Sequence, residues 1–440
     1  MGKATFRGGI HMYDGKDLSK DKKTVALRPK GDVVYPLSQH IGAPAKPIVE
    51  VGDKVLGGQR IAEATGFVSA NVISAVSGTV KAIEKRLTVS GALCDSIVIE
   101  NDGEFTKIEG YGEKRDYTKL SKEEIRQYVK DAGIVGMGGA GFPTHVKLTP
   151  KNDDAIDYVI VNGAECEPYL TSDYRMMLEE TERLVGGLKI ILQLFDKAKG
   201  IILIEDNKPD AIEKISALVK EEPRITVKVA KTKYPQGAER QIINVATGRK
   251  INSSMLPADA GCVVNNVDTV ISVYMAVAES TPLVRRIITV TGDAVANPQN
   301  FSVCTGTSYL ELIEAAGGFT TEPEKVISGG PMMGMALFDL DIPVTKTSSA
   351  LLAFAKDEAV TLPTSPCIRC GRCVSVCPSR LVPQRMMEYA ESFDNEGFVG
   401  LDGMECYECG TCTYVCPAGR RLTQAFKQTR RSILDERRKK

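Results

Sequence analysis

Eight of the 12 cysteines in this 440-residue chain lie close together near its C-terminus. They form two runs, CIRCGRCVSVCP and CYECGTCTYVCP, and each run has the spacing C-x2-C-x2-C-x3-C-P. Thiolates at such short intervals are suited to binding metal, because the chain can wrap several of them around one centre. The N-terminal residues MGKATFRGGIHMYDGK contain no apolar signal-peptide core, so we expect a cytosolic chain whose clustered cysteines bind metal rather than form disulfides.

The duplicated spacing indicates two iron–sulfur clusters. It is the pattern of two-cluster bacterial ferredoxins, in which the fourth cysteine of each run binds the cluster of the other run. We therefore expect one [4Fe–4S] cluster on Cys367, Cys370, Cys373 and Cys416, and a second on Cys406, Cys409, Cys412 and Cys377. Two structural zinc sites would also use eight thiolates and are the alternative. Residues 378–405 separate the two runs, and a helix is predicted there over 383–393.

Composition limits the class of protein. The chain has 56 Lys and Arg residues and 56 Asp and Glu residues, and this balance argues against a general nucleic-acid binder, which would carry a basic excess. No apolar run reaches the length of about 18 residues that a membrane span needs. A length of 440 residues suggests about three domains.

Residues 42–84 have the pattern of a small all-β unit. Valine and isoleucine alternate with polar residues, and turn glycines recur between short runs. The pieces VGDKVLGGQ and AVSGTV resemble the biotinyl/lipoyl type of hybrid barrel. A carrier domain of that type needs a lysine at its hairpin tip, whereas the tip here is ATGFV, residues 64–68. We therefore interpret this unit as a structural β module.

The pattern changes to alternating helices and strands from about residue 121. Helices are predicted over 121–133, 172–195 and 209–220, and strands over 158–161, 201–205 and 225–230. This alternation is typical of a parallel sheet with crossover helices. Residues 284–345 read as a β-rich module with one helix, and TLPTSP at 361–366 reads as a linker into the cysteine segment.

The segment GMGGAGFPT, residues 136–144, is a glycine-rich loop. Glycines permit close backbone approach to a planar or phosphorylated ligand. The loop is not a Walker A motif, because no G-K-[S/T] follows, and it is not the usual dinucleotide fingerprint, because it follows a helix rather than a strand. A tight structural turn is the alternative interpretation.

Four segments carry a resemblance to known proteins. GMGGAGFPTHVK, VNGAECEP, KYPQGAERQ and CVVNNVDTV resemble the NADH- and FMN-binding flavoprotein subunit of respiratory complex I and of related hydrogenases, over roughly 120–345. The whole chain, including GGIHMYDGK, the hybrid barrel and the doubled cysteine run, is similar to the C subunits of Rnf-type ion-translocating oxidoreductases. A complex I flavoprotein carries a single-cluster tail, so the doubled run favours the Rnf family.

The resemblance implies a multidomain α/β and β fold. We expect an N-terminal barrel-sandwich hybrid (1–115), a complex I flavoprotein-like α/β domain that binds FMN and NADH (116–283), and a β-grasp, soluble ligand-binding module (284–350). A two-cluster ferredoxin-type helical domain (360–419) and a basic amphipathic tail (420–440) follow.

The same resemblance implies roles for individual residues. The loop glycines would face a noncovalent FMN, Phe142 would stack on a nucleotide ring, and Lys147 would contact polar groups of flavin or nucleotide. Further segments would line the sites of flavin and NADH. The implied cofactor-binding residues are Gly136, Gly138, Gly139, Gly141, Phe142, Lys147, Asn162, Glu165, Glu167, Tyr234, Gly237, Glu239, Asn265, Asn266 and Thr269. No catalytic acid, base or nucleophile is singled out.

Some positions depart from the complex I pattern. Met137 stands where that pattern has arginine, Ala164 where it has aspartate, and Ala238 where it has glutamate. Cys166 is interpreted as a packing residue with a flavin role as the alternative. The GGPMMG stretch, residues 329–334, is interpreted as core of the β-grasp module.

The C-terminal tail is strongly basic. From Gly419 onward nine residues are basic and two are acidic, so the tail carries +7. Leu422, Phe426 and Ile433 fall near one helical face. Such a helix can lie on anionic lipid or dock on an acidic partner, and a solvated, frayed end is the alternative.

These features together predict a peripheral electron-transfer subunit on the cytoplasmic face of the cell membrane. It would pass electrons between NAD(H), FMN and two [4Fe–4S] clusters in an ion-translocating NADH:ferredoxin oxidoreductase. Its partners would be the other subunits of the membrane complex, NADH and, indirectly, ferredoxin. The alternatives are a flavin subunit of a soluble NADH-linked hydrogenase or dehydrogenase, and an electron-relay module that binds no nucleotide.

Overall fold

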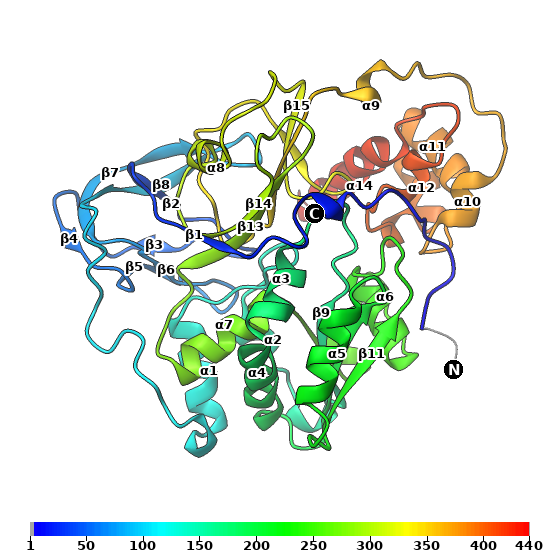
Figure 1. Ribbon diagram of the computed structural model, residues 1–440. Coiled ribbons are helices and arrows are strands. Elements are labelled where there is room, and N and C mark those ends of the chain that lie inside the picture. Colours follow the sequence, from blue (N-terminus) through cyan, green and yellow to red (C-terminus); the bar gives the residue numbers. More distant parts are fainter. Residues whose placement is uncertain (1–3, 440) are drawn as a thin grey trace.

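A computed structural model describes residues 4–439, and its elements fall into four regions that share extensive contacts (Figure 1). These are an all-β unit, a parallel α/β unit, a mixed β-sheet unit and a helical C-terminal unit. Within residues 4–439, no helix is long and apolar enough to cross a membrane. The short 3-10 helices cover Lys16–Leu18, Tyr117–Lys119, Asp153–Ala155, Pro257–Ala260 and Gly403–Glu405.

The all-β unit consists of two facing sheets, as predicted for a barrel-sandwich hybrid. Their inward side chains, among them Val33, Tyr35, Ile61 and Ile97, form one apolar core. One sheet has the order β2-β8-β7-β4, with β2 Val33–Pro36, β4 Lys54–Val55, β7 Gly78–Leu87 and β8 Leu93–Asn101. The other has the order β3-β5-β6, with β3 Lys46–Pro47, β5 Arg60–Glu63 and β6 Val72–Ile73.

The α/β unit contains the predicted parallel sheet, in the order β11-β10-β9-β12. The strands are β9 Tyr158–Gly163, β10 Lys199–Glu205, β11 Ile225–Ala230 and β12 Cys262–Asn266. The helices are α1 Lys122–Asp131, α2 Thr144–Lys147, α3 Ser172–Glu179, α4 Thr181–Gln193, α5 Pro209–Leu218, α6 Glu239–Thr247 and α7 Val267–Ala278. Alternate strand residues face opposite sides of the sheet: Val159 and Val161 pack with α4 and α7, while Ile160 packs with α6.

The continuous helix predicted over 172–195 is wrong, because the chain breaks at Glu180 between α3 and α4. The second helix then packs tightly against α7. Added Cβ atoms at Gly186 and Gly187 would overlap the Tyr274 ring and the Val270 carbonyl oxygen, respectively. Two adjacent glycines therefore permit a helix contact that no larger residue would allow.

The mixed sheet has the order β1-β14-β13-β17-β15-β16, and α8 (Tyr309–Ala315) packs on it. Its strands are β13 Arg285–Thr291, β14 Gln299–Cys304, β15 Lys325–Ser328, β16 Met335–Leu337 and β17 Ala350–Phe354. The edge strand β1 (Val25–Leu27) comes from far away in the sequence and pairs in parallel with β14. The β-grasp region is therefore completed by the N-terminal part of the chain.

Residues 4–24, which we call the N-terminal strap, lie outside both sheets of the all-β unit. Ala4 forms a β-bridge with Ala230 at the end of β11, and Ile10 forms another with Tyr234. The Gly9 amide donates to the carbonyl of Val376 in the helical C-terminal unit, at 2.8 Å. The strap thus joins the α/β unit to the cysteine-bearing unit.

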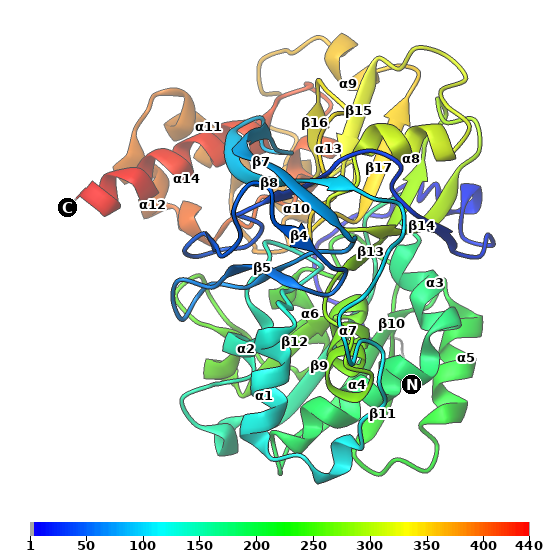
Figure 2. The ribbon, with the colours of Figure 1, turned by 90° about the vertical axis from the view of Figure 1, so that its left-hand side faces the viewer.

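The C-terminal unit is built from short helices around the two cysteine runs. They are α10 Arg372–Val376, α11 Pro383–Glu391, α12 Asn395–Gly400, α13 Thr411–Tyr414 and α14 Leu422–Lys439, and the isolated α9 covers Glu358–Thr361. The predicted helix in the insert is α11. Figure 2 shows α14 lying along α11 and α12.

The apolar face of the tail is not a free surface. Leu422, Phe426 and Ile433 are buried in the core of the C-terminal unit, and Phe426 is only 1% exposed. The Phe426 ring packs against the Phe398 ring at 5.8 Å between centroids. The expectation that this face contacts lipid or a partner is therefore wrong, because α11 and α12 already cover it. Its charged face remains exposed.

Removing residues 421–440 should consequently lower the iron content of the reconstituted chain, rather than only release it from a partner. The truncation takes Leu422 and Phe426 out of the core that contains Cys377 and Cys412. A shorter truncation, 434–440, keeps the buried face and serves as the matched control. Iron and sulfide analysis after anaerobic reconstitution measures cluster content in both truncated chains. Full iron content in the chain that lacks residues 421–440 would contradict the role of α14 in the core around the cysteines.

Candidate functional site

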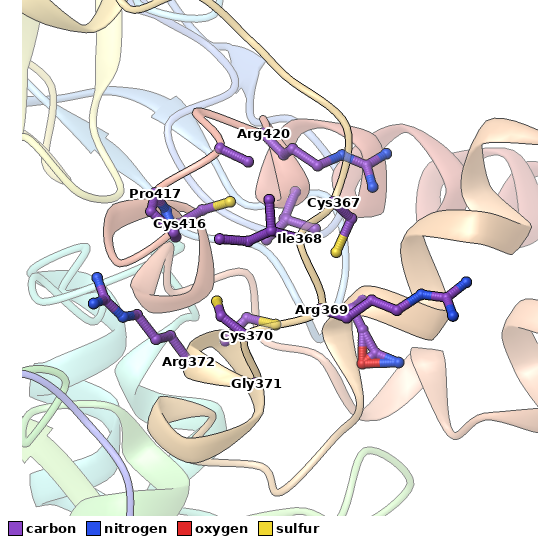
Figure 3. Close-up of a pocket in the computed structure, with 13 residues that line it drawn as sticks. Cys367, Ile368, Arg369, Cys370, Gly371, Arg372, Cys416, Pro417 and Arg420 are labelled. Atoms are coloured by element: carbon purple, nitrogen blue, oxygen red, sulfur yellow. The ribbon is translucent and has the colours of Figure 1, made fainter.

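The structure groups the eight cysteines around two cavities. One is lined by Cys367, Cys370, Cys373 and Cys416, and the other by Cys377, Cys406, Cys409 and Cys412. In Figure 3 the sulfur atoms of Cys367, Cys370 and Cys416 point toward the space between them. Each cavity thus receives its fourth cysteine from the opposite run, as the ferredoxin spacing predicts.

The donor set fits [4Fe–4S] clusters. Within residues 4–439, no three His, Cys, Asp or Glu side chains lie close enough to hold a single metal ion. The four thiols of each set instead stand around a space, which differs from the convergence on one ion that the zinc alternative requires. Gly371 and Gly410, with φ of 75° and 83°, make the left-handed turn that starts the helix within each run.

Burial changes the acidity of these thiols. It raises the pKa of Cys406 and Cys412 to about 12, and it raises the pKa of Cys377 and Cys409 as well. Because the ligands of a cluster are thiolates, loading of this set must release protons into solvent.

The predicted flavin residues gather at the carboxyl ends of β9 and β12. Along the chain, β9 is followed by β10 and β11 on one side, and the chain then returns to place β12 on the other side. The strand order therefore reverses between β9 and β12. In open parallel sheets, ligands bind at the carboxyl ends of the strands, at the point where the strand order reverses. Asn162, the second-last residue of β9, lies beside Asn266, the last residue of β12, in the register of the two strands. Asn265 precedes Asn266 in β12.

The glycine loop closes over this edge. The Gly136 amide donates to the Phe142 carbonyl at 2.8 Å, and the Met137 amide donates to the Thr269 hydroxyl at 3.0 Å. Gly138, Gly139 and Ala140 form its exposed tip. Thr269 is fully buried and fixes the loop through this hydrogen bond, and a direct flavin contact of its side chain stays a prediction. We call the loop, Lys147 and Asn265 the glycine-loop site.

Two buried amide side chains have free hydrogen-bonding capacity: Asn265 in the glycine-loop site, and Gln236 outside it, next to Gly237 in the sequence. Asn265 is 2% exposed, and neither its side-chain nitrogen nor its oxygen has a hydrogen-bond partner within residues 4–439. Gln236, which is fully buried, is unpartnered in the same way in the described chain. Because buried amides are normally paired, both suggest a ligand, and a flavin ring offers matching donors and acceptors. Gln236 was missed, although it lies within the KYPQGAERQ segment.

Lys147 borders the loop from α2. Its ammonium donates to the Val264 carbonyl at 3.2 Å and lies 3.8 Å from the carboxylate of Glu239 at the start of α6. Desolvation lowers the pKa of Lys147. Lys147, whose side chain is 24% exposed, is a cation that adjoins both the loop and β12, and it fits an anionic group such as the FMN phosphate.

The remaining asparagines are engaged with protein atoms. The Asn162 side chain donates to the Gly237 carbonyl at 2.8 Å and accepts from the Ala164 amide. Asn266 donates to Asp173 at 2.6 Å and accepts from the Asp268 amide. These residues hold the site together, and a direct flavin contact of either stays a prediction.

The arginine that the complex I pattern carries at the second loop position is replaced by Met137. Here the guanidinium of Arg286, on β13, lies 2.8 Å from the Met137 sulfur and pairs with the buried carboxylate of Asp268. The mixed sheet therefore supplies a cation beside this loop position. No feature of the sequence pattern pointed to Arg286.

The acidic turn, residues 165–170, lies under the N-terminal strap. Lys16, only 5% exposed, donates from its ammonium to the carbonyls of Glu165, Glu167 and Leu170. The Glu165 carboxylate lies 3.5 Å from the same ammonium and accepts from the Asp173 amide at 2.7 Å. Glu165 thus fixes the turn, and a direct contact with a cofactor stays a prediction. Lys16 was missed because its partners are about 150 positions away in sequence.

Glu167 has one free oxygen. Its Oε2 accepts from the Met332 amide at 3.1 Å, whereas Oε1 has no partner in the described chain. Burial raises the pKa of Glu167 to about 7. The Met332 segment therefore contacts the acidic turn, and Met333 and Met335 are exposed, so the expectation that GGPMMG forms core of the β-grasp module is wrong.

Tyr234 connects the α/β unit to the buried cysteine set. Its hydroxyl donates to the carbonyl of Cys409, a predicted cluster ligand, at 2.7 Å, and the side chain is buried. Three residues later, Gly237 donates to the Cys166 sulfur at 3.2 Å and accepts from Asn162. Burial raises the pKa of Cys166 far above its ordinary value, in keeping with a packing role. A short chain of contacts therefore links the end of β9 to the buried cysteine set.

Four family models match this chain in consecutive order. They are the RnfC barrel sandwich hybrid domain (residues 4–104), the Nuo51 FMN-binding domain (129–275), the SLBB domain (287–336) and the 4Fe-4S dicluster domain (366–420). The FMN-binding match contains the glycine-loop site, and the dicluster match contains both cysteine sets.

Two relatives are similar over most of their length. The C subunit of the Na(+)-translocating ferredoxin:NAD(+) oxidoreductase complex of Acetobacterium woodii is 45% identical, over 99% of this chain and 98% of its own length. The C subunit of the proton-translocating complex of Clostridium ljungdahlii is 46% identical, over 87% of this chain and 83% of its own. A crystal structure of an NAD+-reducing [NiFe]-hydrogenase shares the fold, with a TM-score of 0.51 at 20% identity over 72% of this chain and 63% of that one.

Substitution of the cysteine that each set receives from the opposite run tests the crossed assignment of the cysteines to the two clusters. Cys416→Ser should remove the cluster held by Cys367, Cys370 and Cys373, while Cys377→Ser should remove the other. Each variant should keep about half of the iron, because each set binds one of two cubanes. Iron analysis combined with electron paramagnetic resonance of the reduced variants distinguishes the two. Identical spectra from both variants would contradict the crossed assignment.

Gly139→Val should weaken FMN binding by about tenfold or more, equivalent to about 1.4 kcal/mol. An added Cβ at Gly139 meets no atom within 4 Å, so the fold tolerates it and any loss reflects the ligand. Gly138 and Gly141 are poorer choices, since their Cβ atoms would lie 3.0 Å from Asn266 and 2.8 Å from Thr347. The matched control is Gly400→Val, an equally open position in α12. Flavin fluorescence titration measures both, and unchanged affinity at Gly139 would leave the loop as a structural turn.

Proposed function

The chain belongs to the family of C subunits of Rnf-type ion-translocating ferredoxin:NAD(+) oxidoreductase complexes, and on this premise we propose how its residues perform electron transfer. It is the electron-transfer subunit of an ion-translocating NADH:ferredoxin oxidoreductase, with FMN and [4Fe–4S] clusters as cofactors. When bound, FMN supplies the conversion between the two-electron hydride chemistry of NADH and the one-electron chemistry of iron–sulfur clusters.

The glycine-loop site is suited to hold the flavin. The exposed tip at Gly138 and Gly139 admits a planar ring close to the backbone, Asn265 offers an unpaired donor and acceptor, and Lys147 offers a positive charge. Phe142, at the end of the loop, would provide an aromatic face for a nucleotide ring. Glu167, with one unpaired oxygen, would accept a hydrogen bond from NADH.

The observation that carries this proposal is the buried contact between Tyr234 and Cys409. It holds a complete cysteine set against the segment that also binds Asn162 at the carboxyl end of β9. A cofactor at that edge would be separated from the nearest cluster by a few packed side chains rather than by solvent. The buried set would therefore exchange electrons with the flavin first, and the more exposed set would follow.

We propose the domain bounds 1–115, 116–283, 284–350 and 360–419. The basic tail 420–440 packs onto the last of these domains through α14, and the N-terminal strap connects the α/β domain to it. We further place the protein on the cytoplasmic face of the membrane, because NADH is a cytoplasmic substrate. The partners would be the membrane-embedded subunits of the complex, and ferredoxin through them. Protease treatment of inside-out vesicles would digest the chain under this orientation and leave it intact under the opposite one.

The decisive experiment is anaerobic reconstitution with iron, sulfide and FMN, followed by addition of NADH. We expect about one FMN and about eight irons per chain, and bleaching of the absorbance of both flavin and clusters by NADH. Gly139→Val should keep its iron and lose NADH-dependent cluster reduction, while dithionite still reduces its clusters. A wild-type chain that holds iron but neither binds flavin nor responds to NADH would instead be an electron-relay module. Recovery in the membrane fraction distinguishes the translocating complex from a soluble hydrogenase or dehydrogenase.

A further inference from the structure

The segment GGPMMG, residues 329–334, joins β15 to β16 in the mixed sheet and contacts both of the other functional units. The Met332 amide donates to Oε2 of Glu167 in the acidic turn, at 3.1 Å. The Met332 side chain packs on Gly410, where its Cε would lie 3.2 Å from an added Cβ. One residue of the mixed sheet therefore contacts both the predicted NADH-binding carboxylate and the second cysteine run.

The Met332 side chain belongs to an apolar cluster around Cys409. Ile10, Tyr234 and Cys409 are the buried members of this cluster, and Met332 packs against them. Cys409 and Gly410 line the cavity of the buried cysteine set, which consists of Cys377, Cys406, Cys409 and Cys412. Methionine is flexible and unbranched, so it fills irregular gaps of this kind. Because Met332 is only partly buried while Cys409 is buried, the Met332 side chain lies between solvent and the cysteine.

The backbone of residues 329–334 is held closely against the acidic turn. An added Cβ at Gly330 would overlap the Glu167 carboxylate, and the Gly334 amide donates to the Gly330 carbonyl at 2.8 Å. Burial raises the pKa of Glu167 to about 7, so little water reaches the carboxylate under this segment. Met333, in contrast, is 49% exposed. The two neighbouring methionines therefore differ in role: Met332 packs inward on Gly410, and Met333 faces solvent.

From these contacts we propose that Met332 is a positioning residue for electron transfer, which shields the buried cysteine set from water on its nucleotide side and keeps the reduction potential of the cluster there low. The inference rests on the proposed function and gives the mixed sheet a part in it. Reduction adds one electron to that cluster, and no bond is made or broken. Water stabilises the added negative charge better than apolar side chains do, so excluding water disfavours the reduced form. The nearby Glu167 carboxylate, when ionised, acts in the same direction by charge repulsion.

Redox titration of the full-length, cluster-loaded chain with dithionite, followed by electron paramagnetic resonance, tests the proposal. Met332→Ala should favour reduction of the cluster in the buried set by about tenfold, which is a rise of about 59 mV for a one-electron couple. Met332→Leu nearly conserves the volume and should stay within about twofold of the wild type. The matched control Met333→Ala removes the same side chain from the exposed neighbouring position and should leave both potentials unchanged. The signal that shifts should be the one that Cys377→Ser removes.

Iron content must match the wild type in each variant. If Met332→Ala loses iron, Met332→Gln replaces it, because this variant keeps the length of the side chain, adds a polar amide and should also raise the potential. Unchanged potentials in a variant with full iron content would overturn the proposal. A shift confined to the other cluster, or an equal shift in Met333→Ala, would overturn it as well.

Dithionite supplies the electrons in this titration, so the result depends on neither FMN nor NADH. A chain whose clusters do not respond to NADH, but whose potential shifts with Met332, would refute the proposed function alone. Reduction of the clusters by NADH, with potentials that are indifferent to Met332, would refute this inference alone.

Discussion

The hydrogen bond from Tyr234 to the Cys409 carbonyl is the contact on which the rest of the architecture depends. Electron transfer between two cofactors is useful only if the protein holds them at a short and constant separation. A hydroxyl buried at this junction would be costly to separate from its acceptor, since each polar group would then lose its partner away from water. The α/β unit and the cysteine-bearing unit are thereby fixed to each other at the point where an electron has to cross.

The N-terminal strap reinforces this junction from outside. Ile10 pairs with Tyr234 through both backbone groups, and Gly9 reaches the carbonyl of Val376 next to Cys377. Gly9, with φ of 76°, also packs so closely that an added Cβ would lie 2.6 Å from the Tyr234 carbonyl oxygen. Further along, the Lys16 ammonium gathers three carbonyls of the acidic turn. A single extended segment therefore orients Tyr234, Glu167 and the buried cysteine set relative to one another.

Local sequence patterns predicted the helices and strands well. They predicted poorly which residues distant in the sequence contact one another. The strand at 225–230 has the predicted bounds, because alternating β-branched residues define a strand without reference to its neighbours. The thiols are grouped as their spacing predicts, since each run wraps three corners locally. The assignment of individual cysteines as ligands of each cluster stays a prediction. Periodicity identified the apolar face of α14 but could not show that α11 and α12 cover it. Lys16 and Arg286 were beyond prediction, because their roles come from carbonyls and side chains distant in sequence.

The crossed grouping of the cysteines has a consequence for biogenesis. Cys416 and α14 leave the ribosome after the barrel and the α/β unit, and each cysteine set contains residues from both runs. Domains fold largely in order of synthesis, so the barrel and the α/β unit are complete while the cluster sites still lack a ligand or their covering helix. Each complete cysteine set therefore becomes available for a cluster only after the second run has been synthesised, when the nucleotide-binding half of the chain can already be folded. A truncated product arrested within the last run would present a finished flavin fold with no route for its electrons.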